Sequence, residues 1–249
     1  WLRLLPAGTT WTAERSAYAT LLNNMDDEFV NGAEPGFDIG ICSENEYNDW
    51  IGAQIRGDLY GWVCPGRPAL AAELAARDAA LSHRGEGVRG AMFIAALGAA
   101  IPVSPDINAA VDIALEQIPE DSLTAAAVRF GRKIVGRDDA VELLHQEYAD
   151  LPPVHTLNNL ALVVWALLSA GGDFSAAIGE AVAAGWDTDC SGATVGGLFG
   201  LTGHAIPDLW TAPWNECVGV SLAGHSELSL EDLVSRTVAV ADSIRAGQV

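Results

Sequence analysis

Apolar residues recur at intervals of three and four positions along most of the chain, which predicts a succession of amphipathic helices. Alternating apolar and polar stretches bounded by hairpin turns are nearly absent. The pattern therefore predicts an all-α fold, and 249 residues, half of them hydrophobic, suffice for one domain over 1–249. The expected helices cover residues 11–23, 50–59, 68–81, 105–115, 121–135, 138–148, 156–168, 173–184 and 229–245. Two further helices are expected, one that contains Met92 and another that begins near Asp189.

Residues typical of helix ends support several of these boundaries. Pro68 suits a first helical position, and Ser104 with Pro105 would supply a cap followed by a first-turn proline. The helix over 156–168 is so apolar that we expect it at the centre of the core. The stretch 24–48 is rich in Asp, Glu, Gly and Asn, and it is predicted to be a long polar surface loop.

Composition narrows the classes of partner. The chain has 33 acidic and 13 basic residues, and nucleic-acid binding depends on basic patches, so we expect no nucleic-acid partner. No uninterrupted apolar run reaches the length of a membrane span, and the first residues lack a leader pattern, so we expect no membrane contact. The four cysteines stand far apart without a C-x-x-C motif, which favours reduced thiols in a cytoplasmic protein.

The stretch from Gly185 to Gly197 carries the strongest chemical signal. Asp187 and Asp189 stand one residue apart before a run of small residues. A divalent cation would relieve the repulsion between these carboxylates, and hard ions such as magnesium prefer carboxylate oxygens. Because Gly185 would end one helix, Asp187 would lie in a turn and Asp189 near the start of the next helix. The pattern is explained equally well if Asp187 only caps the helix and Asp189 is a carboxylate of its first turn.

Two other features of the sequence are weaker indications of a binding site. Gly85 to Gly90 match G-x-G-x-x-G, but a predicted helix precedes them where a dinucleotide-binding site requires a strand. As a turn that opens a helix, they would still offer backbone N–H groups to a diphosphate, although plain helix connections also use such glycines. His155 precedes the very apolar helix and is a candidate for a polar contact, with a satisfied core or cap role as the alternative.

Three segments together resemble the ADP-ribosylglycohydrolase family, all-α enzymes related to dinitrogenase reductase-activating glycohydrolase. The segments are 51–56, 81–92 and 185–190, and the last looks like the family's late G-G-D-T-D-T element. The likeness extends over nearly the whole chain. It implies a single compact domain of orthogonal helices.

The resemblance also implies a function and a site. The implied reaction is magnesium-dependent hydrolysis of the glycosidic bond that links ADP-ribose to an acceptor, or of a related N- or O-riboside. Two magnesium ions are implied for the intact protein, with Asp187, Asp189 and Cys190 at positions of metal ligands. The residues implied to contact ADP-ribose are Gly85, Glu86, Gly87, Val88, Arg89, Gly90 and His155.

The chain departs from the family pattern in its early part. Members have an early acidic element that supplies the other metal ligands, with an acidic residue upstream assigned to catalysis, and neither is found here. Asp26 and Asp27 are adjacent, but they follow the segment that should come after this element. The chain begins at Trp1 without a methionine, and residues 1–6 read as the last turn of a helix. We therefore expect a fragment whose missing N-terminal part holds the catalytic residues.

Further departures concern the ligands. Cys190 stands where the family supplies a hydroxyl, and a thiol is a poor partner for hard magnesium. Ser191 as a substitute, a weakened site and a softer ion are all compatible with this change. Glu86 and Arg89 stand where we expect Asn and Tyr, and a glutamate beside a diphosphate is unfavourable.

The sequence leaves two other functions open. One is a non-catalytic helical module that binds ADP-ribose or a metal, and the other is a purely structural helical domain. The acceptor group of the substrate and the oligomeric state are also open.

Overall fold

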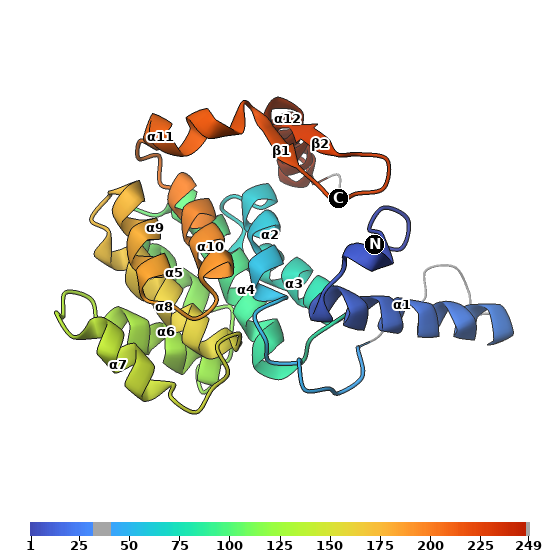
Figure 1. The fold of residues 1–249 in the computed structure, drawn as a ribbon, viewed down its shortest axis with the longest axis horizontal. Helices are drawn as coiled ribbons and strands as arrows, with labels where there is room; N and C mark the ends of the chain where they lie inside the picture. The colour runs from blue at the N-terminus through green and yellow to red at the C-terminus, as the bar shows by residue number, and fades with distance from the viewer. Residues whose placement is uncertain (32–40, 248–249) are drawn as a thin grey trace.

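The computed structural model describes residues 1–31 and 41–247, with the backbone alone for residues 24–31. This part of the chain forms twelve α-helices, four short 3-10 helices and one two-stranded antiparallel sheet, which confirms the predicted all-α class (Figure 1). In chain order the elements are η1 Ala7–Thr9, α1 Thr12–Asn31, η2 Gln54–Arg56, α2 Asp58–Val63, α3 Pro68–Ala79, α4 Gly85–Ala100, η3 Ile101–Val103, α5 Ile107–Leu115, α6 Leu123–Lys133, α7 Ala140–Glu147, α8 Thr156–Ser169, α9 Phe174–Ala183, α10 Thr188–Gly200, α11 Asp208–Thr211, η4 Ala212–Trp214, β1 Cys217–Gly219, β2 Glu227–Ser229 and α12 Leu230–Arg245.

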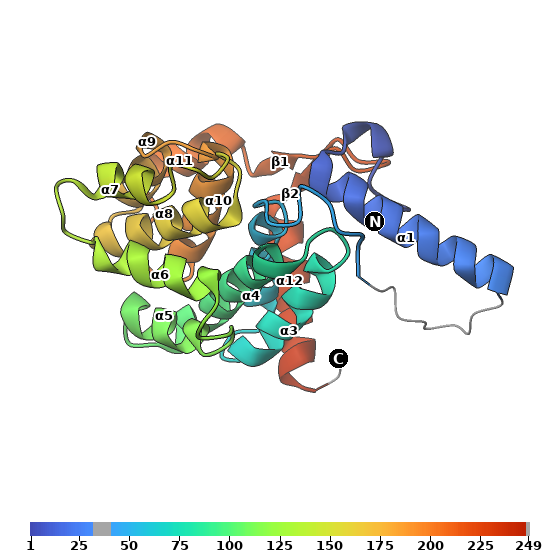
Figure 2. The same cartoon turned by 90° about the horizontal axis from the view of Figure 1, so that it is seen from below.

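Helices α4 and α8 form the centre of the core. Every residue of α8 from Thr156 to Leu167 is buried, as its apolar sequence predicts. Helix α4 contacts α2, α3, α5, α6 and α8, and Figure 2 shows it in the middle of the molecule. Among the described helices, the continuous stretch Gly85–Val103 is the one long and apolar enough to cross a membrane. Most of that stretch is buried against other helices, as expected for a helix in the core of the fold.

Side-chain caps are present at the beginnings of two predicted helices. Ser122 and Asp173 precede α6 and α9, and their side-chain oxygens accept the N–H groups of Ala125 and Ala176. Such caps satisfy first-turn donors that have no partner within the helix. Pro68 occupies the first position of α3, as predicted.

One predicted helix start is wrong. Asp106, not Ser104, is the N-cap of α5, and its carboxylate accepts the N–H of Ala109 at 2.8 Å. The hydroxyl of Ser104 instead donates to the Ala100 carbonyl at 2.8 Å, so it ends the preceding helical segment.

The predicted helix over 50–59 is also divided differently. Trp50 forms an isolated antiparallel bridge with His155, and the N–H of Ile51 donates to the Val154 carbonyl at 2.9 Å. This extended pairing holds the backbone out of helical geometry, so regular helix begins only at η2 and α2.

The predicted polar loop over 24–48 is wrong at its beginning. Helix α1 continues to Asn31, because polar composition alone does not end a helix and no glycine or proline stands between 12 and 31. Residues 32–40 lie outside the described residues. Residues 41–48 have no regular helix or strand, as expected for a loop.

Candidate functional site

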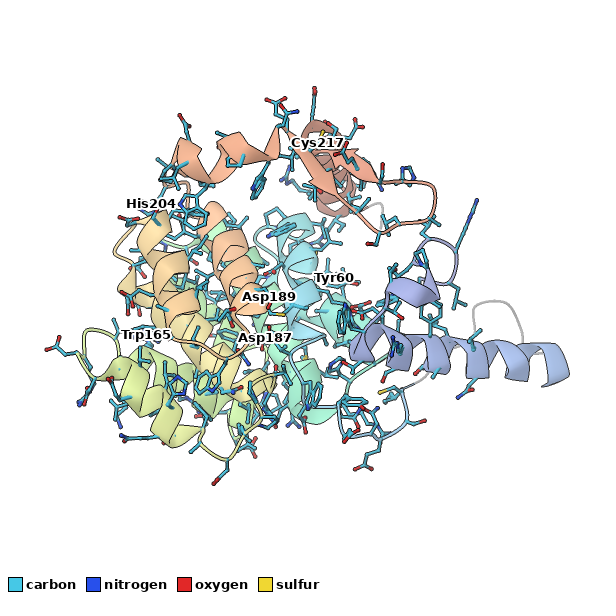
Figure 3. All side chains as sticks on the ribbon, in the orientation of Figure 1. Tyr60, Trp165, Asp187, Asp189, His204 and Cys217 are labelled. Carbon is cyan, nitrogen blue, oxygen red and sulfur yellow. The ribbon has the colours of Figure 1, made fainter. Side chains whose placement is uncertain are left out.

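The loop between α9 and α10 brings the predicted acidic residues together. Gly185 and Trp186 have φ angles of +91° and +61°, which reverse the chain direction after α9. Asp187 then takes the N-cap position of α10, and Asp189 lies in its first turn. Ligand atoms of Asp187, Asp189 and Cys190 all lie within 4.8 Å of one another. Figure 3 shows both labelled aspartates at the same end of α10.

The cluster is electrostatically unfavourable on its own. Partial burial raises the pKa of Asp187, and the neighbouring Asp189 carboxylate raises it further, whereas a hydrogen bond from Cys190 opposes the shift. Burial also raises the pKa of the Cys190 thiol, together with its hydrogen bond to Asp187 and the two negative charges. Both shifts have causes that a positive charge between these side chains would counteract.

Asn159 of α8 fixes the position of this loop. Its carboxamide oxygen accepts the N–H of Asp187 at 3.2 Å and the hydroxyl of Ser191 at 3.1 Å. Its amide nitrogen donates to the carbonyls of Pro153 and His155, both at 2.8 Å. Asn159 is fully buried, so these bonds connect the acidic loop to the most buried helix of the molecule. The local sequence gives no sign of this role of Asn159, because its partners are 28 and 32 residues away.

The acidic cluster opens into a cavity of about 370 Å³. Its lining residues are Trp11, Thr12, Ala13, Glu14, Trp50, Ile51, Gly52, Ile55, His83, Val154, Asp187, Asp189 and Cys190. Glu14 is the third carboxylate in this lining, beside Asp187 and Asp189. Its side chain accepts the backbone N–H of Trp11 at 2.8 Å. Glu14 stands in no motif of the sequence, whereas Gly52 belongs to segment 51–56, one of the three that resemble the family.

His155 has the capping role that the sequence left open as an alternative. Its Nδ1 atom accepts the N–H of Leu157 at 3.1 Å at the start of α8. Burial lowers the pKa of His155, while the negative charges of Asp49 and Glu86 oppose this shift. His155 is not among the residues that line the cavity, although its neighbour Val154 is.

Residues 85–90 are the first six residues of α4 and do not form a separate loop. The N–H groups of Glu86 and Gly87 donate to the Asp49 carboxylate at 3.0 and 3.3 Å. The Glu86 carboxylate accepts the N–H and hydroxyl of Thr124 at 2.8 and 2.6 Å and also pairs with Arg89. The amides predicted to hold a diphosphate are therefore occupied by the chain's own Asp49. A role for this turn in substrate binding stays a prediction.

The turn also faces a different cavity from the acidic cluster. Gly85, Val88 and Arg89 line a cavity of about 400 Å³, together with Met92. His83 lines both this cavity and the one at the acidic cluster. Three of the predicted substrate residues thus line a neighbouring cavity and not the one at the acidic cluster.

An apolar cavity of about 690 Å³ lies along another face of α10, and Asp189 lines it as well. Trp62, Trp210 and Trp214 supply aromatic surface there, and Asp58 is the other acidic side chain in the lining. Burial raises the pKa of Asp58 to about 8, and its Oδ1 atom has no hydrogen-bond partner among the described residues. The sequence signal for this residue is a single carboxylate at the first position of the apolar helix α2.

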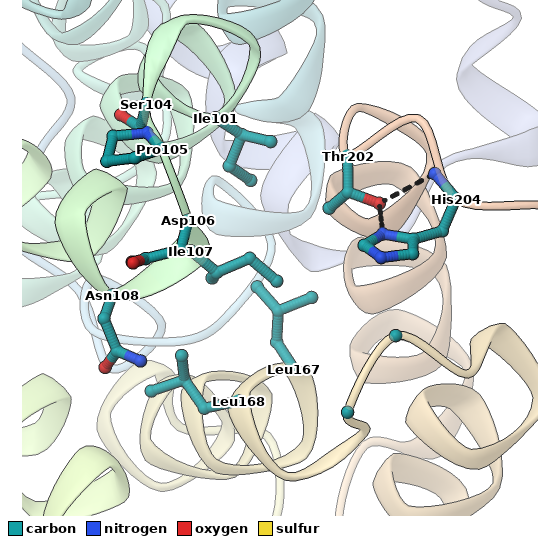
Figure 4. A pocket seen from close by; sticks show the side chains of 12 residues that line it. Ile101, Ser104, Pro105, Asp106, Ile107, Asn108, Leu167, Leu168, Thr202 and His204 are labelled. Atoms are coloured by element: carbon teal, nitrogen blue, oxygen red, sulfur yellow. Dashed lines mark hydrogen bonds between the residues drawn. The ribbon is translucent and has the colours of Figure 1, made fainter.

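A further cavity, of about 320 Å³, is remote from the acidic cluster (Figure 4). Its lining includes Asp106, Asn108 and Leu168, with Thr202 and His204, whose side chains lie 2.8 Å apart. These last two follow the C-terminal end of α10, whereas the acidic cluster is at its N-terminal end, about 20 Å away for a helix of this length. This cavity is therefore not part of the candidate site.

The carboxylates of Asp187 and Asp189 are suitable ligands for a hard divalent cation. The thiol of Cys190 is not, because thiols prefer softer ions. Asp187 and Asp189 are the residues of this cluster that would hold magnesium. The identity of the metal stays a prediction.

Comparison with known proteins agrees with this architecture. The family model for ADP-ribosylglycohydrolase matches residues 4–244. An uncharacterized protein of Archaeoglobus fulgidus is 30% identical over 176 residues, which are 66% of this chain and 53% of the archaeal protein. The chain thus spans about half the length of this relative. No solved structure matches the chain. Because the family model covers nearly all of the sequence, the chain belongs to the ADP-ribosylglycohydrolase family.

Proposed function

We propose that this protein hydrolyses the glycosidic bond between ADP-ribose and an acceptor, or a related N- or O-riboside, in a magnesium-dependent reaction. The observation that carries the proposal is the convergence of Asp187, Asp189 and Cys190 at a cavity in a member of a glycohydrolase family. The cysteines Cys42, Cys64, Cys190 and Cys217 form no disulfide among the described residues. A cytoplasmic location stays a prediction.

Asp187 and Asp189 would hold the cation at the N-terminus of α10. A bound divalent ion supplies charge that orients sugar hydroxyls and polarises a water molecule. The chain's own contribution is to fix the two carboxylates, and Asn159 does so by holding the backbone of Asp187 and the side chain of Ser191. A site held in this way needs little rearrangement when the cation binds.

The substrate would extend from the acidic cluster towards the start of α4. His83 lines the cavities on both sides, so one ligand of the length of ADP-ribose could contact the acidic cluster and the 85–90 turn. Arg89 offers positive charge to a diphosphate, although its present partner is Glu86. In this arrangement the diphosphate contacts side chains, since Asp49 already uses the amides of Glu86 and Gly87.

A non-catalytic module that binds ADP-ribose or a metal is the second candidate. It is favoured by the donor set itself, because all three ligand atoms of the cluster come from the single segment 187–190. A catalytic site of this kind also needs a group that accepts or donates a proton at the scissile bond. Glu14 lines the cavity, but its carboxylate is engaged with the Trp11 amide.

Release of free ADP-ribose from a panel of peptides modified on different side chains tests the proposal. We expect release with magnesium, none with a chelator, and at least a hundredfold loss in Asp189→Asn, a magnitude on the order of that for one lost electrostatic contact in a transition state. Asp208→Asn, in the first turn of α11, is the matched control. Magnesium-dependent binding of ADP-ribose without release from any peptide would contradict the enzyme and support the module.

A further inference from the structure

The cavity of about 690 Å³ along α10 is the largest of the cavities described above. The proposed reaction does not use it, although Asp189 lines it. Helix α2 packs against α10, and in Figure 1 α11 lies above α9 and α10. The walls are mainly apolar, with Ile178 and Val182 from α9 and the small residues 192, 193, 196 and 197 from α10. A cavity of this size accommodates a small organic molecule.

Three tryptophans provide aromatic surface in this cavity. Trp62 comes from α2, Trp210 from α11 and Trp214 from η4. Trp62 and Trp214 are 39% and 52% exposed, so a ligand that enters from solvent can contact them. The ring of Trp210 is fixed, because its Nε1–H donates to the Ser175 hydroxyl at 2.8 Å. The faces of tryptophan rings attract organic cations.

The charged side chains in this lining are acidic. Asp58 and Asp189 are the carboxyl groups, and none of the described residues that line the cavity is Lys, Arg or His. The formal charge of the whole chain is −20, which adds a long-range attraction for cations. The cavity therefore disfavours an anionic ligand and favours one with a positive charge.

Asp58 is the buried acid of this cavity. It is 8% exposed, and its enclosed Oδ1 atom has no hydrogen-bond partner among the described residues. Its Oδ2 atom is not enclosed in this way. A Cβ atom at Gly197 would lie 3.9 Å from this Oδ2 and 3.2 Å from Cζ2 of Trp62, so a carboxyl group and an aromatic ring meet at one glycine of α10. Because a buried carboxylate is stable only when it is paired, a cationic group beside Oδ2 would supply the missing partner.

We propose that this cavity binds an organic ammonium ion, whose apolar body lies against Trp62 and Trp214 and whose charged nitrogen pairs with Asp58. An amine with an aromatic or alkyl body is the class of ligand that uses both the tryptophan surface and the buried acid. The site is separate from the proposed function, because its ligand requires neither magnesium nor ADP-ribose.

Calorimetric titration in a chelator at pH 7, with three probes that share one apolar body, tests the charge of the ligand. The probes are phenylbutylamine, phenylbutanol and phenylbutyrate, which are cationic, neutral and anionic. We expect the amine to bind more tightly than the alcohol by on the order of tenfold, and the carboxylate not to bind. Equal affinity for the amine and the alcohol would overturn the proposal, since the groove would then bind only through its apolar surface. Absence of amine binding would also overturn it.

Variants of the lining test the two contacts. Asp58→Asn should weaken amine binding by on the order of tenfold and leave alcohol binding unchanged, and unchanged amine binding would overturn the proposal. Trp214→Ala should weaken the binding of both probes, because it removes part of the apolar surface. Trp11→Ala is the matched control, since Trp11 is also exposed but lines the cavity at the acidic cluster. Equal effects of the two tryptophan variants would contradict the assigned contact.

The release of a proton gives a second measure of the pairing with Asp58. Burial raises the pKa of Asp58 to about 8, so at pH 7 the empty cavity holds its carboxyl group in the protonated form. Asp189 of α10 is the other titratable group among the described lining residues. Pairing with an ammonium ion should release the proton of Asp58, and the heat of binding should then depend on the buffer in wild-type protein and not in Asp58→Asn. Buffer-independent heats in the wild type would overturn the ion pair.

Asp187→Asn distinguishes this site from the acidic cluster, because Asp187 lines the cavity at the cluster and not the one at Asp58. We expect amine binding to be unchanged in this variant. A loss of amine binding in Asp187→Asn without a loss in Asp58→Asn would place the amine at the acidic cluster and overturn the proposal. Since all titrations lack magnesium and ADP-ribose, their failure leaves the proposed function standing.

Discussion

The carboxamide oxygen of Asn159 accepts the backbone N–H of Asp187 at 3.2 Å, across 28 residues of sequence. The same oxygen accepts the hydroxyl of Ser191, so one buried side chain holds both ends of the segment that carries the acidic cluster. The geometry of the cluster therefore depends on α8, although none of its ligand atoms belongs to that helix. Stability and cation binding should respond together when this connection is removed.

Asn159→Ala should lower the free energy of unfolding by about 2–4 kcal/mol, because it leaves several buried partners without a hydrogen bond. It should also weaken magnesium binding, measured as the cation-induced rise in melting temperature. Thr124→Ala is the control, since Thr124 is equally buried and its hydroxyl donates to Glu86 and not to the acidic loop. An equal magnesium response in the two variants would show that Asn159 does not hold the cluster.

Cys190→Ser should change the preference among cations. A hydroxyl is a better ligand than a thiol for hard magnesium, whereas a thiol prefers soft ions. We expect magnesium affinity to rise and cadmium affinity to fall, each on the order of threefold to tenfold, in titrations followed by melting temperature. Unchanged affinity for both ions would mean that the Cys190 side chain is not a ligand.

Asp58→Asn should stabilise the protein increasingly as pH rises. Burial raises the pKa of Asp58 to about 8 in the folded protein, above its ordinary value of 3.8. Between pH 4 and 8 the unfolded chain loses this proton while the folded chain keeps it, so wild-type stability falls across this range. Each pH unit corresponds to about 1.4 kcal/mol at most. The asparagine side chain of the variant does not titrate, so the variant does not lose this stability as pH rises.

Denaturant unfolding at pH 5 and pH 8.5 measures this difference. Asp58→Asn should gain on the order of a few kcal/mol relative to wild type between the two values. The exposed Asp150→Asn should show no comparable change. If Asp58→Asn has the same effect at both pH values, its carboxyl group does not titrate as its burial implies.

Glu86→Ala should destabilise the fold, whatever substrate the protein binds. The Glu86 carboxylate accepts two hydrogen bonds from Thr124 in the first turn of α6, so it connects the beginnings of α4 and α6. We expect a loss of about 1–3 kcal/mol in urea unfolding. Glu116→Ala, at the exposed C-cap of α5, should cost far less, and an equal cost would argue against this structural role.

Local signals predicted most of the fold. Pro68, Ser122 and Asp173 mark helix starts because each acts within one turn of its own position. The convergence of Asp187 and Asp189 was predictable for the same reason, since Gly185 and the N-terminus of α10 are close in sequence.

Contacts over long sequence distances were not predictable from the sequence. The amides of Glu86 and Gly87 matched an anion-binding pattern, but Asp49, 37 and 38 residues earlier, occupies them. The bridge between Trp50 and His155 likewise depends on pairing across about a hundred residues, and it replaces part of a predicted helix. Such contacts are decided by packing and have no counterpart in local periodicity.

Calorimetric titration with ADP-ribose, in magnesium and in chelator, is the decisive measurement. We expect binding to the wild-type protein in magnesium, little or none in chelator, and loss of the magnesium effect in Asp187→Asn and Asp189→Asn. Binding of equal affinity with and without magnesium would contradict the assigned role of the acidic pair, as would a magnesium effect that persists in both variants.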